Sequence, residues 1–255
     1  MGLYGAIICE KQAMEIAHEF LDEIRSNYDG ILAFYVIGSL GGGYYRPGQS
    51  DIDTLIIVSN DATVKQEEMD ALGEKYATMY NIPKGFGAVV IPVKHLSSPY
   101  DEYEHTEEVA RLKTQGKVVY SEIDLSSLKM PTVADYIEDA LSKEEWLAET
   151  DGDALYEKFG VRGCVNIIVG YLGRYTAIKT GVFEFNKLNK IETYMRYDPP
   201  MVNEQVFDFI QKHLQDEAEG NDSDLYMLRT FGAELRTFFN RWLRSEEIQA
   251  KRENH

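Results

Sequence analysis

The chain has 255 residues and a formal net charge of −17, with 26 Lys and Arg against 43 Asp and Glu. Apolar residues make up 44% and charged residues 27%, the usage of an ordinary folded protein, which argues against extended disorder. A chain this acidic repels phosphate backbones unless basic residues gather on one face, and no Lys/Arg-rich run does so. We therefore expect no nucleic-acid partner, and the length suggests one large domain or two small ones.

The two cysteines, Cys9 and Cys164, stand far apart and form neither a disulfide framework nor a zinc-binding spacing. The first residues lack the basic and apolar regions of a signal peptide, and no apolar run approaches the roughly 18–20 residues that span a bilayer. We expect a reduced, cytoplasmic protein with no membrane association.

The first half of the chain alternates between helix and strand patterns. Residues 10–28 place apolar side chains at the i, i+3, i+4 spacing of an amphipathic helix. Residues 31–37 form a continuous apolar run rich in β-formers, which is typical of a strand buried on both faces. The further elements expected in this half are strands at 51–58, 86–93 and 117–120 and a helix at 63–80.

After about residue 130, apolar positions follow helical spacing almost everywhere. The helices expected there cover 132–148, 154–180, 202–216 and 223–247, and the polar residues from about Glu246 onward are expected to be frayed. The pattern thus predicts an α/β (α+β) domain with a small mixed sheet over 1–128, followed by an all-α helical bundle over 129–255.

The segment that carries chemistry joins the first two predicted strands. Side chains at i and i+2 of a strand share a face, so Asp51 and Asp53 are predicted to present two carboxylates side by side, with Ile52 turned into the core. Like charges this close repel unless a cation lies between them, and oxygen-only ligands suit Mg²⁺ or Mn²⁺.

Gly38 and Ser39 end the first predicted strand and begin a glycine-rich loop. Glycine lets the backbone approach a bulky anion, and Ser39 offers a hydroxyl and an N–H to a terminal phosphate. A helix starting at Ser39 would add a favourable dipole. A phosphate cradle facing a carboxylate pair is the layout for metal-assisted transfer of a nucleotidyl group.

The stretch Val36-Ile37-Gly38-Ser39, a loop, then Asp51-Ile52-Asp53-Thr54 resembles the motif of the DNA polymerase β-like nucleotidyltransferase superfamily, departing from it only at Thr54, where an apolar residue is usual. The detailed resemblance covers about residues 31–58. The two-part layout is similar to that of the kanamycin nucleotidyltransferase and streptomycin adenylyltransferase group.

This resemblance implies transfer of a nucleoside monophosphate from an NTP, ATP in the first place, to a hydroxyl of a small, aminoglycoside-like acceptor, an activity of the antibiotic-resistance kind. It gives Asp51 and Asp53 the catalytic and metal-binding roles, with Mg²⁺ or Mn²⁺ as cofactor. Gly38 and Ser39 would hold the β- and γ-phosphates. A cationic acceptor would suit the acidic chain, and would lie between the two halves.

One part of the superfamily pattern is missing. A third carboxylate normally lies on the strand after the next helix, yet residues 86–93 contain no acid. Three explanations remain open: an acid of the segment 101–104, above all Glu104; a carboxylate of the helical half; or a protein that binds nucleotide but turns it over slowly or not at all. The candidates in the helical half are Glu138, Glu144 and Glu145. The alternative interpretation of Glu144 and Glu145 is that they lie on a solvated helix face.

Other residues carry two interpretations each. Arg46 is a candidate phosphate contact or a surface charge, and Tyr44 and Tyr45 would stack on a base or simply pack. Arg174 and Lys179 of the helical half would reach the triphosphate or stay on a helix face. Two alternative functions are a regulatory binding module with the same fold and a tRNA- or poly(A)-adding enzyme, the latter disfavoured by charge. A homodimer is a further expectation for the helical half.

Overall fold

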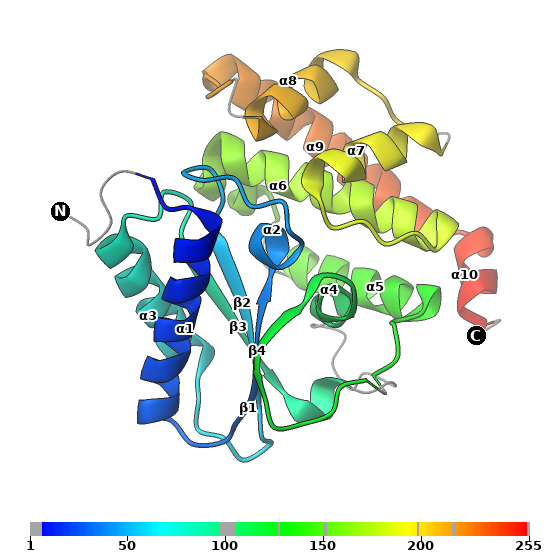
Figure 1. Cartoon of the computed structure of the whole chain (residues 1–255). Helices are drawn as coiled ribbons and strands as arrows, with labels where there is room; N and C mark the ends of the chain where they lie inside the picture. The colour runs from blue at the N-terminus through cyan, green and yellow to red at the C-terminus, as the bar shows by residue number, and fades with distance from the viewer. Residues whose placement is uncertain are drawn as a thin grey trace. The chain divides into compact units, whose positions relative to one another are not determined.

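The computed structural model describes residues 7–96, 106–126, 128–149, 152–197, 199–215 and 218–253, with the side chains of 145–149, 152–159 and 253 outside that description. The chain divides into two compact units, Met1–Met130 and Pro131–His255. Figure 1 labels the elements of both units. No helix in the described ranges is long and apolar enough to cross a membrane.

The first unit contains a four-stranded mixed sheet, as predicted. Its strands are β1 (Ile31–Ile37), β2 (Ile52–Val58), β3 (Phe86–Pro92) and β4 (Lys117–Ser121), in the spatial order β3-β2-β1-β4. β2 runs parallel to β3 and antiparallel to β1, and β4 is antiparallel to β1. Both strands that carry the predicted site, β1 and β2, therefore lie in the centre of the sheet.

Two helices, α1 (Glu10–Asn27) and α3 (Gln66–Tyr80), cover one face of the sheet (Figure 1). The apolar stripe expected on α1 is buried, and its Phe20 lies against the ring of Phe86 on β3 with centroids 4.5 Å apart. The two helices are also tied by polar contacts, because the Tyr76 hydroxyl donates to Glu23 Oε2 at 2.9 Å. This face of the sheet is therefore fixed by both packing and hydrogen bonds.

The opposite face carries α4 (Thr106–Gln115), a helix that the sequence patterns did not predict. Its buried Val109 and Leu112 join Ile37 of β1 and Leu55 of β2 in one apolar cluster. Before α4, β3 ends at Pro92, which lacks an N–H for a continuing ladder, and one 3₁₀ turn, η1 (Val93–Leu96), follows.

The second unit is all helical, as predicted. Its helices are α5 (Val133–Glu149), α6 (Gly152–Thr180), α7 (Lys187–Arg196), α8 (Glu204–Leu214), α9 (Asp222–Leu243) and α10 (Glu246–Glu253). The long α6 packs on α5, α7 and α9. Its helical geometry breaks at Gly160, where φ is 58° and ψ is −161°. Cys164 is fully buried in α6.

The prediction that the chain frays after Glu246 is wrong, because α10 forms there. Its single apolar anchor, Ile248, is fully buried. Lys251 donates through Nζ to the carbonyl oxygens of Ile178 and Lys179, at 3.1 and 3.2 Å, which caps the end of α6. Arg252 adds an ion pair with Glu138 of α5, so a buried apolar side chain and two basic residues hold a helix whose sequence is otherwise polar.

Candidate active site

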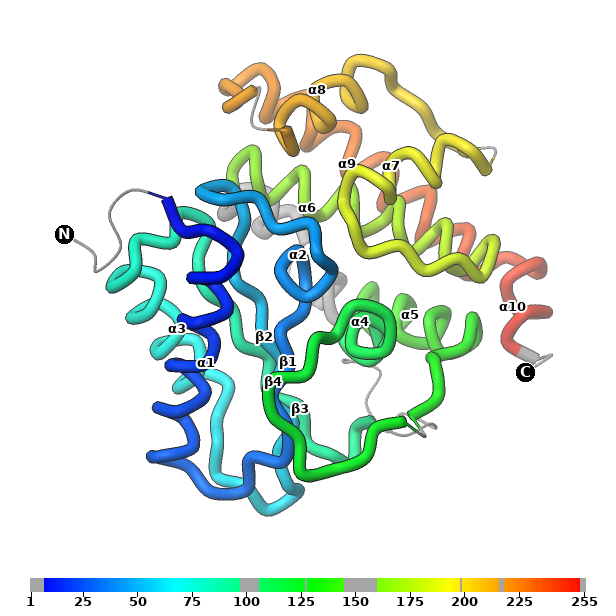
Figure 2. Tube along the Cα trace, viewed as in Figure 1, coloured from blue at the N-terminus to red at the C-terminus, as the bar shows by residue number. Residues whose placement is uncertain are grey.

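The predicted site begins where β1 ends. Ile37 is followed by one helical turn, α2 (Gly38–Gly41), and then by a loop over residues 42–51 that leads into β2. Figure 2 follows this path along the chain. The loop is closed by backbone bonds, with Tyr44 N–H donating to the Ser39 carbonyl oxygen at 3.0 Å. The short helix therefore starts at Gly38, one residue before the expected Ser39, and its first amides have no intrahelical acceptor.

Gly38 brings the backbone directly against the second aspartate of the motif. Its φ of 64° lies in the left-handed region, and a Cβ added there would stand 2.5 Å from Asp53 Oδ2. Glycine is therefore required at this position both by conformation and by space. The Gly-Ser and Asp-Ile-Asp parts of the motif, 13 residues apart in sequence, lie in contact here.

Ser39 carries a buried side-chain hydroxyl that has no hydrogen-bond partner among the described residues. Leaving a buried polar group unpaired costs about 1–3 kcal/mol, so such groups in native proteins usually meet a ligand or water. A phosphate oxygen is an acceptor that this hydroxyl would satisfy. The geometry therefore fits the phosphate-holding role that the resemblance implies for Ser39.

Asp53 lies within β2 and pairs with Ile37 of β1 on one side and with Gly87 of β3 on the other. A Cβ on Gly87 would stand 3.2 Å from Asp53 Oδ1, so the neighbouring strand offers a bare backbone beside this carboxylate. The adjacent Thr54, the one departure from the motif, is fully buried and donates its hydroxyl to the Gly87 carbonyl oxygen at 3.0 Å. Thr54 thus binds the two strands together beside Asp53.

Asp51 immediately precedes β2, and Ile52 between the two acids is fully buried, as predicted. Tyr45 is buried in the cluster beneath α1, where burial and then the negative charge of Asp51 raise the pKa of its hydroxyl. Of the two interpretations of Tyr45, the structure favours packing. Tyr44 donates its hydroxyl to Gln115 Oε1 of α4 at 3.5 Å.

Arg46 lies in the same loop with an exposed side chain. Its backbone N–H donates to Ser50 Oγ at 3.0 Å, and its carbonyl oxygen accepts from the amides of Gln49 and Ser50. The backbone of Arg46 therefore shapes the loop, and its role toward a phosphate stays a prediction.

Sequence reasoning missed one charged residue of this region, Arg111 of α4. Its Nη2 lies 2.9 Å from Glu107 Oε1. Burial acts to lower the pKa of the guanidinium, but the carboxylates of Glu107, Glu108 and Asp53 outweigh it and raise the pKa. The i, i+4 spacing of Glu107 and Arg111 was a visible helix signal, yet nothing in the sequence linked Arg111 to Asp53.

The sequence family is decided by the segment that contains this site. The family model for the nucleotidyltransferase domain matches residues 17–149, more than half of the chain. The chain belongs to the nucleotidyltransferase domain family. The match includes all four strands of the sheet together with Gly38, Ser39, Asp51 and Asp53. No curated protein sequence matches this nucleotidyltransferase-family chain.

One solved structure has the same fold. The crystal structure of spectinomycin adenyltransferase AAD(9) from Enterococcus faecialis, with ATP and spectinomycin, aligns with a TM-score of 0.60 at 13% identity, covering 89% of this chain and 99% of that chain. A toxin–antitoxin structure with AMP-PNP aligns at 17% identity over 53% of this chain and 93% of that one, with a TM-score of only 0.32.

The carboxylates proposed as a third ligand in this nucleotidyltransferase-family protein lie in several environments. Glu104 lies outside the described residues, as does the side chain of Glu145. Glu138 forms an ion pair with Arg252. Within the described ranges, no three His, Cys, Asp or Glu side chains form a group that could hold a metal ion.

The interpretation of Glu144 as a solvated residue is wrong, because its side chain is buried inside the helical unit. Its carboxylate accepts from the hydroxyl of Tyr171, from Nδ2 of Asn240 and, at 3.2 Å, from Nε of Arg236. Both oxygens are thus engaged by donors of α6 and α9. Arg174, another candidate from the sequence, lies 4.0 Å from the buried Asp139 through Nε.

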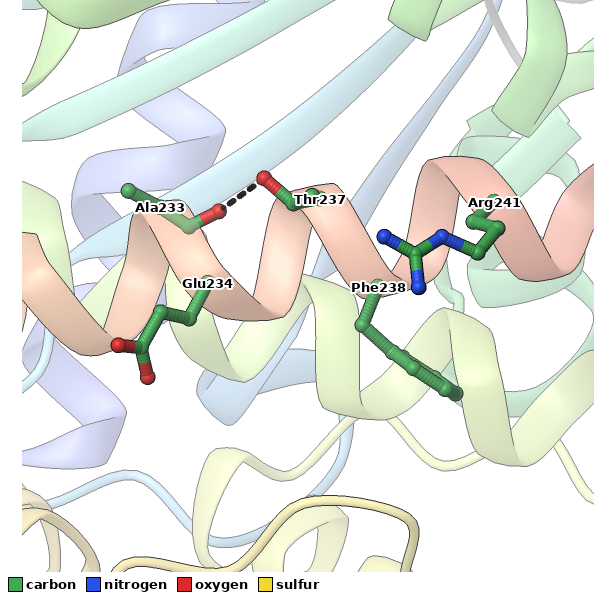
Figure 3. A pocket seen from close by; sticks show the side chains of 5 residues that line it. All are labelled: Ala233, Glu234, Thr237, Phe238 and Arg241. Atoms are coloured by element: carbon green, nitrogen blue, oxygen red, sulfur yellow. Dashed lines mark hydrogen bonds between the residues drawn. The ribbon is translucent and has the colours of Figure 1, made fainter.

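A hollow of about 390 Å³ lies along α9, lined by Ala233, Glu234, Thr237, Phe238 and Arg241. Figure 3 shows these side chains along one side of the helix, with the Thr237 hydroxyl bonded to the Ala233 carbonyl oxygen at 2.9 Å. None of the residues predicted from the motif lines this hollow.

Proposed function

We propose that the protein is a metal-dependent nucleotidyltransferase that moves a nucleoside monophosphate from an NTP, ATP in the first place, to a hydroxyl of a small acceptor. The observation that carries this proposal is the convergence at the end of β1. Gly38 lies against Asp53, and the buried hydroxyl of the adjacent Ser39 has no hydrogen-bond partner in the part of the chain that the structure describes. A glycine that admits an anion and a hydroxyl that lacks an acceptor support a phosphate-binding role.

The reaction forms one P–O bond and breaks another. The acceptor oxygen bonds to the α-phosphorus and loses its proton to solvent, while the bond between the α-phosphorus and the bridging oxygen breaks and pyrophosphate leaves. Asp51 and Asp53 would hold Mg²⁺ or Mn²⁺, which lowers the charge on the phosphates and activates the acceptor oxygen. Ser39 and the first amides of α2 would position the β- and γ-phosphates.

The acceptor class follows from charge and from likeness of fold. At a net charge of −17, the protein attracts cations to its surroundings, which favours an acceptor with amino groups. The adenyltransferase with the same fold was solved with spectinomycin and ATP. We therefore propose an aminoglycoside-like acceptor.

Isothermal titration with MgATP tests the nucleotide site. We expect saturable binding to the native protein and at least a tenfold loss of affinity in Asp51→Asn/Asp53→Asn. The matched control is Asp61→Asn/Asp70→Asn, which removes the same two charges from exposed positions of the first unit and leaves binding unchanged. Equal MgATP affinity in the native protein and the site double variant would show that the metal assignment is wrong.

A second candidate function, a nucleotide-binding module without turnover, is favoured by Gly87. This glycine faces Asp53 on the strand where the superfamily normally carries its third carboxylate. Incubation with labelled ATP and a panel of aminoglycosides and other hydroxylated compounds distinguishes the two functions. A labelled, pyrophosphate-releasing product with any acceptor excludes the module, whereas tight MgATP binding without any product favours it.

A further inference from the structure

Both oxygens of the Asp53 carboxylate lie against glycine backbone. A Cβ added to Gly38, at the end of β1, would stand 2.5 Å from Asp53 Oδ2, and one added to Gly87 of β3 would stand 3.2 Å from Oδ1. The strand register agrees, because Asp53 pairs with Ile37 on one side and with Gly87 on the other. The carboxylate therefore occupies a slot whose width depends on how closely the two glycines approach it.

The two walls of this slot are held differently. β1 lies inside the sheet with a paired strand on each side, whereas β3 lies at the edge of the four described strands. On the outer side of β3, the Gln66 side chain of α3 donates through Nε2 to the Ala88 carbonyl oxygen at 2.7 Å and accepts through Oε1 from the Val90 amide at 2.9 Å. This outer contact acts from Ala88 onward, and Gly87 itself is held from the inner side, by β2.

Thr54 of β2 supplies this inner contact. Its side chain is fully buried, and its hydroxyl donates to the Gly87 carbonyl oxygen at 3.0 Å. Alternation along the strand directs this side chain, like those of Ile52 and Ile56, toward the face covered by α1 and α3, whereas Asp53 projects from the opposite face. The hydroxyl therefore acts on the site through β3 and does not itself contact a ligand at Asp53. A buried hydroxyl costs free energy unless it is hydrogen-bonded, so the bond to Gly87 is what distinguishes Thr54 from the apolar residue usual in the motif.

We propose that Thr54 is a positioning residue of the carboxylate site. By holding the backbone of Gly87, its hydroxyl sets the width of the slot and keeps the Asp53 carboxylate in one orientation. A carboxylate that is already oriented loses less conformational freedom when a divalent ion binds, so the ion binds more tightly. The metal part of this inference rests on the proposed function, whereas the orientation of Asp53 is a property of the free protein.

The orientation of Asp53 can be measured by NMR on the metal-free, full-length protein. Three-bond couplings between the Asp53 Cγ and the backbone nuclei report its χ1 rotamers. We expect a single rotamer in the native protein and in Thr54→Ser, which keeps the hydroxyl. Thr54→Val has nearly the same shape without the hydroxyl, and we expect rotamer averaging there. A single, unchanged rotamer in Thr54→Val, or averaging already in the native protein, would overturn the inference.

Binding of Mn²⁺ alone, followed by electron paramagnetic resonance, measures the consequence for the metal. We expect Thr54→Val to bind Mn²⁺ about fivefold more weakly than the native protein, a smaller loss than for a side chain bonded directly to a metal ligand, and Thr54→Ser to bind like the native protein. The matched control is Thr176→Val, which removes a buried hydroxyl that donates to the Leu172 carbonyl oxygen at 2.9 Å in the other unit. It should leave Mn²⁺ affinity unchanged. Equal affinities of Thr54→Val and the native protein would overturn the inference.

Gln66→Ala separates positioning from a general loosening of β3. This variant removes both outer contacts of the strand and keeps the bond between Thr54 and Gly87. We expect it to lower the unfolding free energy, measured in urea, and to leave both the Asp53 rotamer and the Mn²⁺ affinity unchanged. If Gln66→Ala changes them as much as Thr54→Val does, the role of Thr54 is structural only.

Failure of the proposed function is distinguishable from failure of this inference. If the native protein binds neither Mn²⁺ nor MgATP, the proposed function fails. The couplings of Asp53 in the metal-free protein still decide whether Thr54 positions that carboxylate.

Discussion

Asp53 of β2 and Gly87 of β3 lie opposite each other in a parallel strand pair, and a Cβ on Gly87 would stand 3.2 Å from Asp53 Oδ1. At this register position β3 therefore places backbone, and no side chain, beside Asp53. Gly87 is a position at which a new carboxylate can be placed next to that of Asp53, which permits a direct test of the proposed metal site.

We expect Gly87→Asp to raise the affinity for Mn²⁺ and to lower the stability of the metal-free protein by about 1–2 kcal/mol, because a new carboxylate beside Asp53 repels it until a cation binds. Gly87→Asn has the same size without the charge. It should share any steric cost but not the gain in metal affinity. Chemical denaturation with and without Mn²⁺ measures both effects, and equal metal affinities of the two variants would contradict the proposed metal site.

Gly38→Ala should damage both folding and nucleotide binding. Its φ of 64° strains any L-residue, and the new methyl group would press on Asp53 at 2.5 Å. We expect a loss of about 1–3 kcal/mol in unfolding free energy and at least tenfold weaker MgATP binding. Thermal melts and calorimetric titration measure the two quantities.

Gly43→Ala is the matched control for this change. Gly43 also has a positive φ, 77°, but nothing lies within 4 Å of its added Cβ. The Gly43→Ala variant should lose about 1 kcal/mol of unfolding free energy, through backbone strain alone, and should bind MgATP as tightly as the native protein. If both variants bind MgATP equally, the contact between Gly38 and Asp53 has no part in the site.

The strands β1 and β3 could be predicted from sequence because each is a continuous apolar run whose type does not depend on distant residues. The strand predicted at 31–37 is observed as Ile31–Ile37. The strand predicted at 86–93 is observed as Phe86–Pro92. The contact of Gly38 with Asp53 also follows from local order, since both stand at the ends of neighbouring strands. The chemical roles of these residues stay predictions.

What the sequence could not show depends on residues far apart in the chain. Arg111 lies 58 positions after Asp53, and only the packing of α4 relates the two charges. The sequence predicts Glu144 either as a metal ligand or as part of a solvated helix face, but its partners Tyr171, Arg236 and Asn240 belong to other helices. Periodicity indicates which face of a helix is apolar and cannot indicate which acid will find buried donors.

Glu144→Gln should destabilise the helical unit strongly. The amide would turn an N–H₂ group toward Arg236 or Tyr171 and would remove the negative charge that Arg236 Nε contacts at 3.2 Å. We expect the free energy of unfolding to fall by about 3 kcal/mol, because removing one partner of a buried ion pair is strongly destabilising. Asp208→Asn, whose pair with Lys212 is exposed, should cost less than about 0.5 kcal/mol. Urea denaturation of both variants measures the contrast, and similar losses would show that the Glu144 network contributes little.

Tyr194 should make the stability of the protein sensitive to alkaline pH. Its side chain is fully buried, its hydroxyl donates to the Met201 carbonyl oxygen at 2.9 Å, and burial raises its pKa to about 12. The unfolded chain releases this proton near pH 10, so the stabilisation by the neutral hydroxyl is fully present below pH 10 and is lost as the pH rises toward 12. The unfolding free energy of the native protein should therefore fall relative to that of Tyr194→Phe by about 2–3 kcal/mol across this interval.

The control is Tyr226→Phe. The side chain of Tyr226 is 74% exposed, so this variant should show no such change relative to the native protein. Urea denaturation at a series of pH values from 8 to about 11.5 measures these differences. A constant difference between the native protein and Tyr194→Phe over that range would show that ionisation of Tyr194 is not linked to folding.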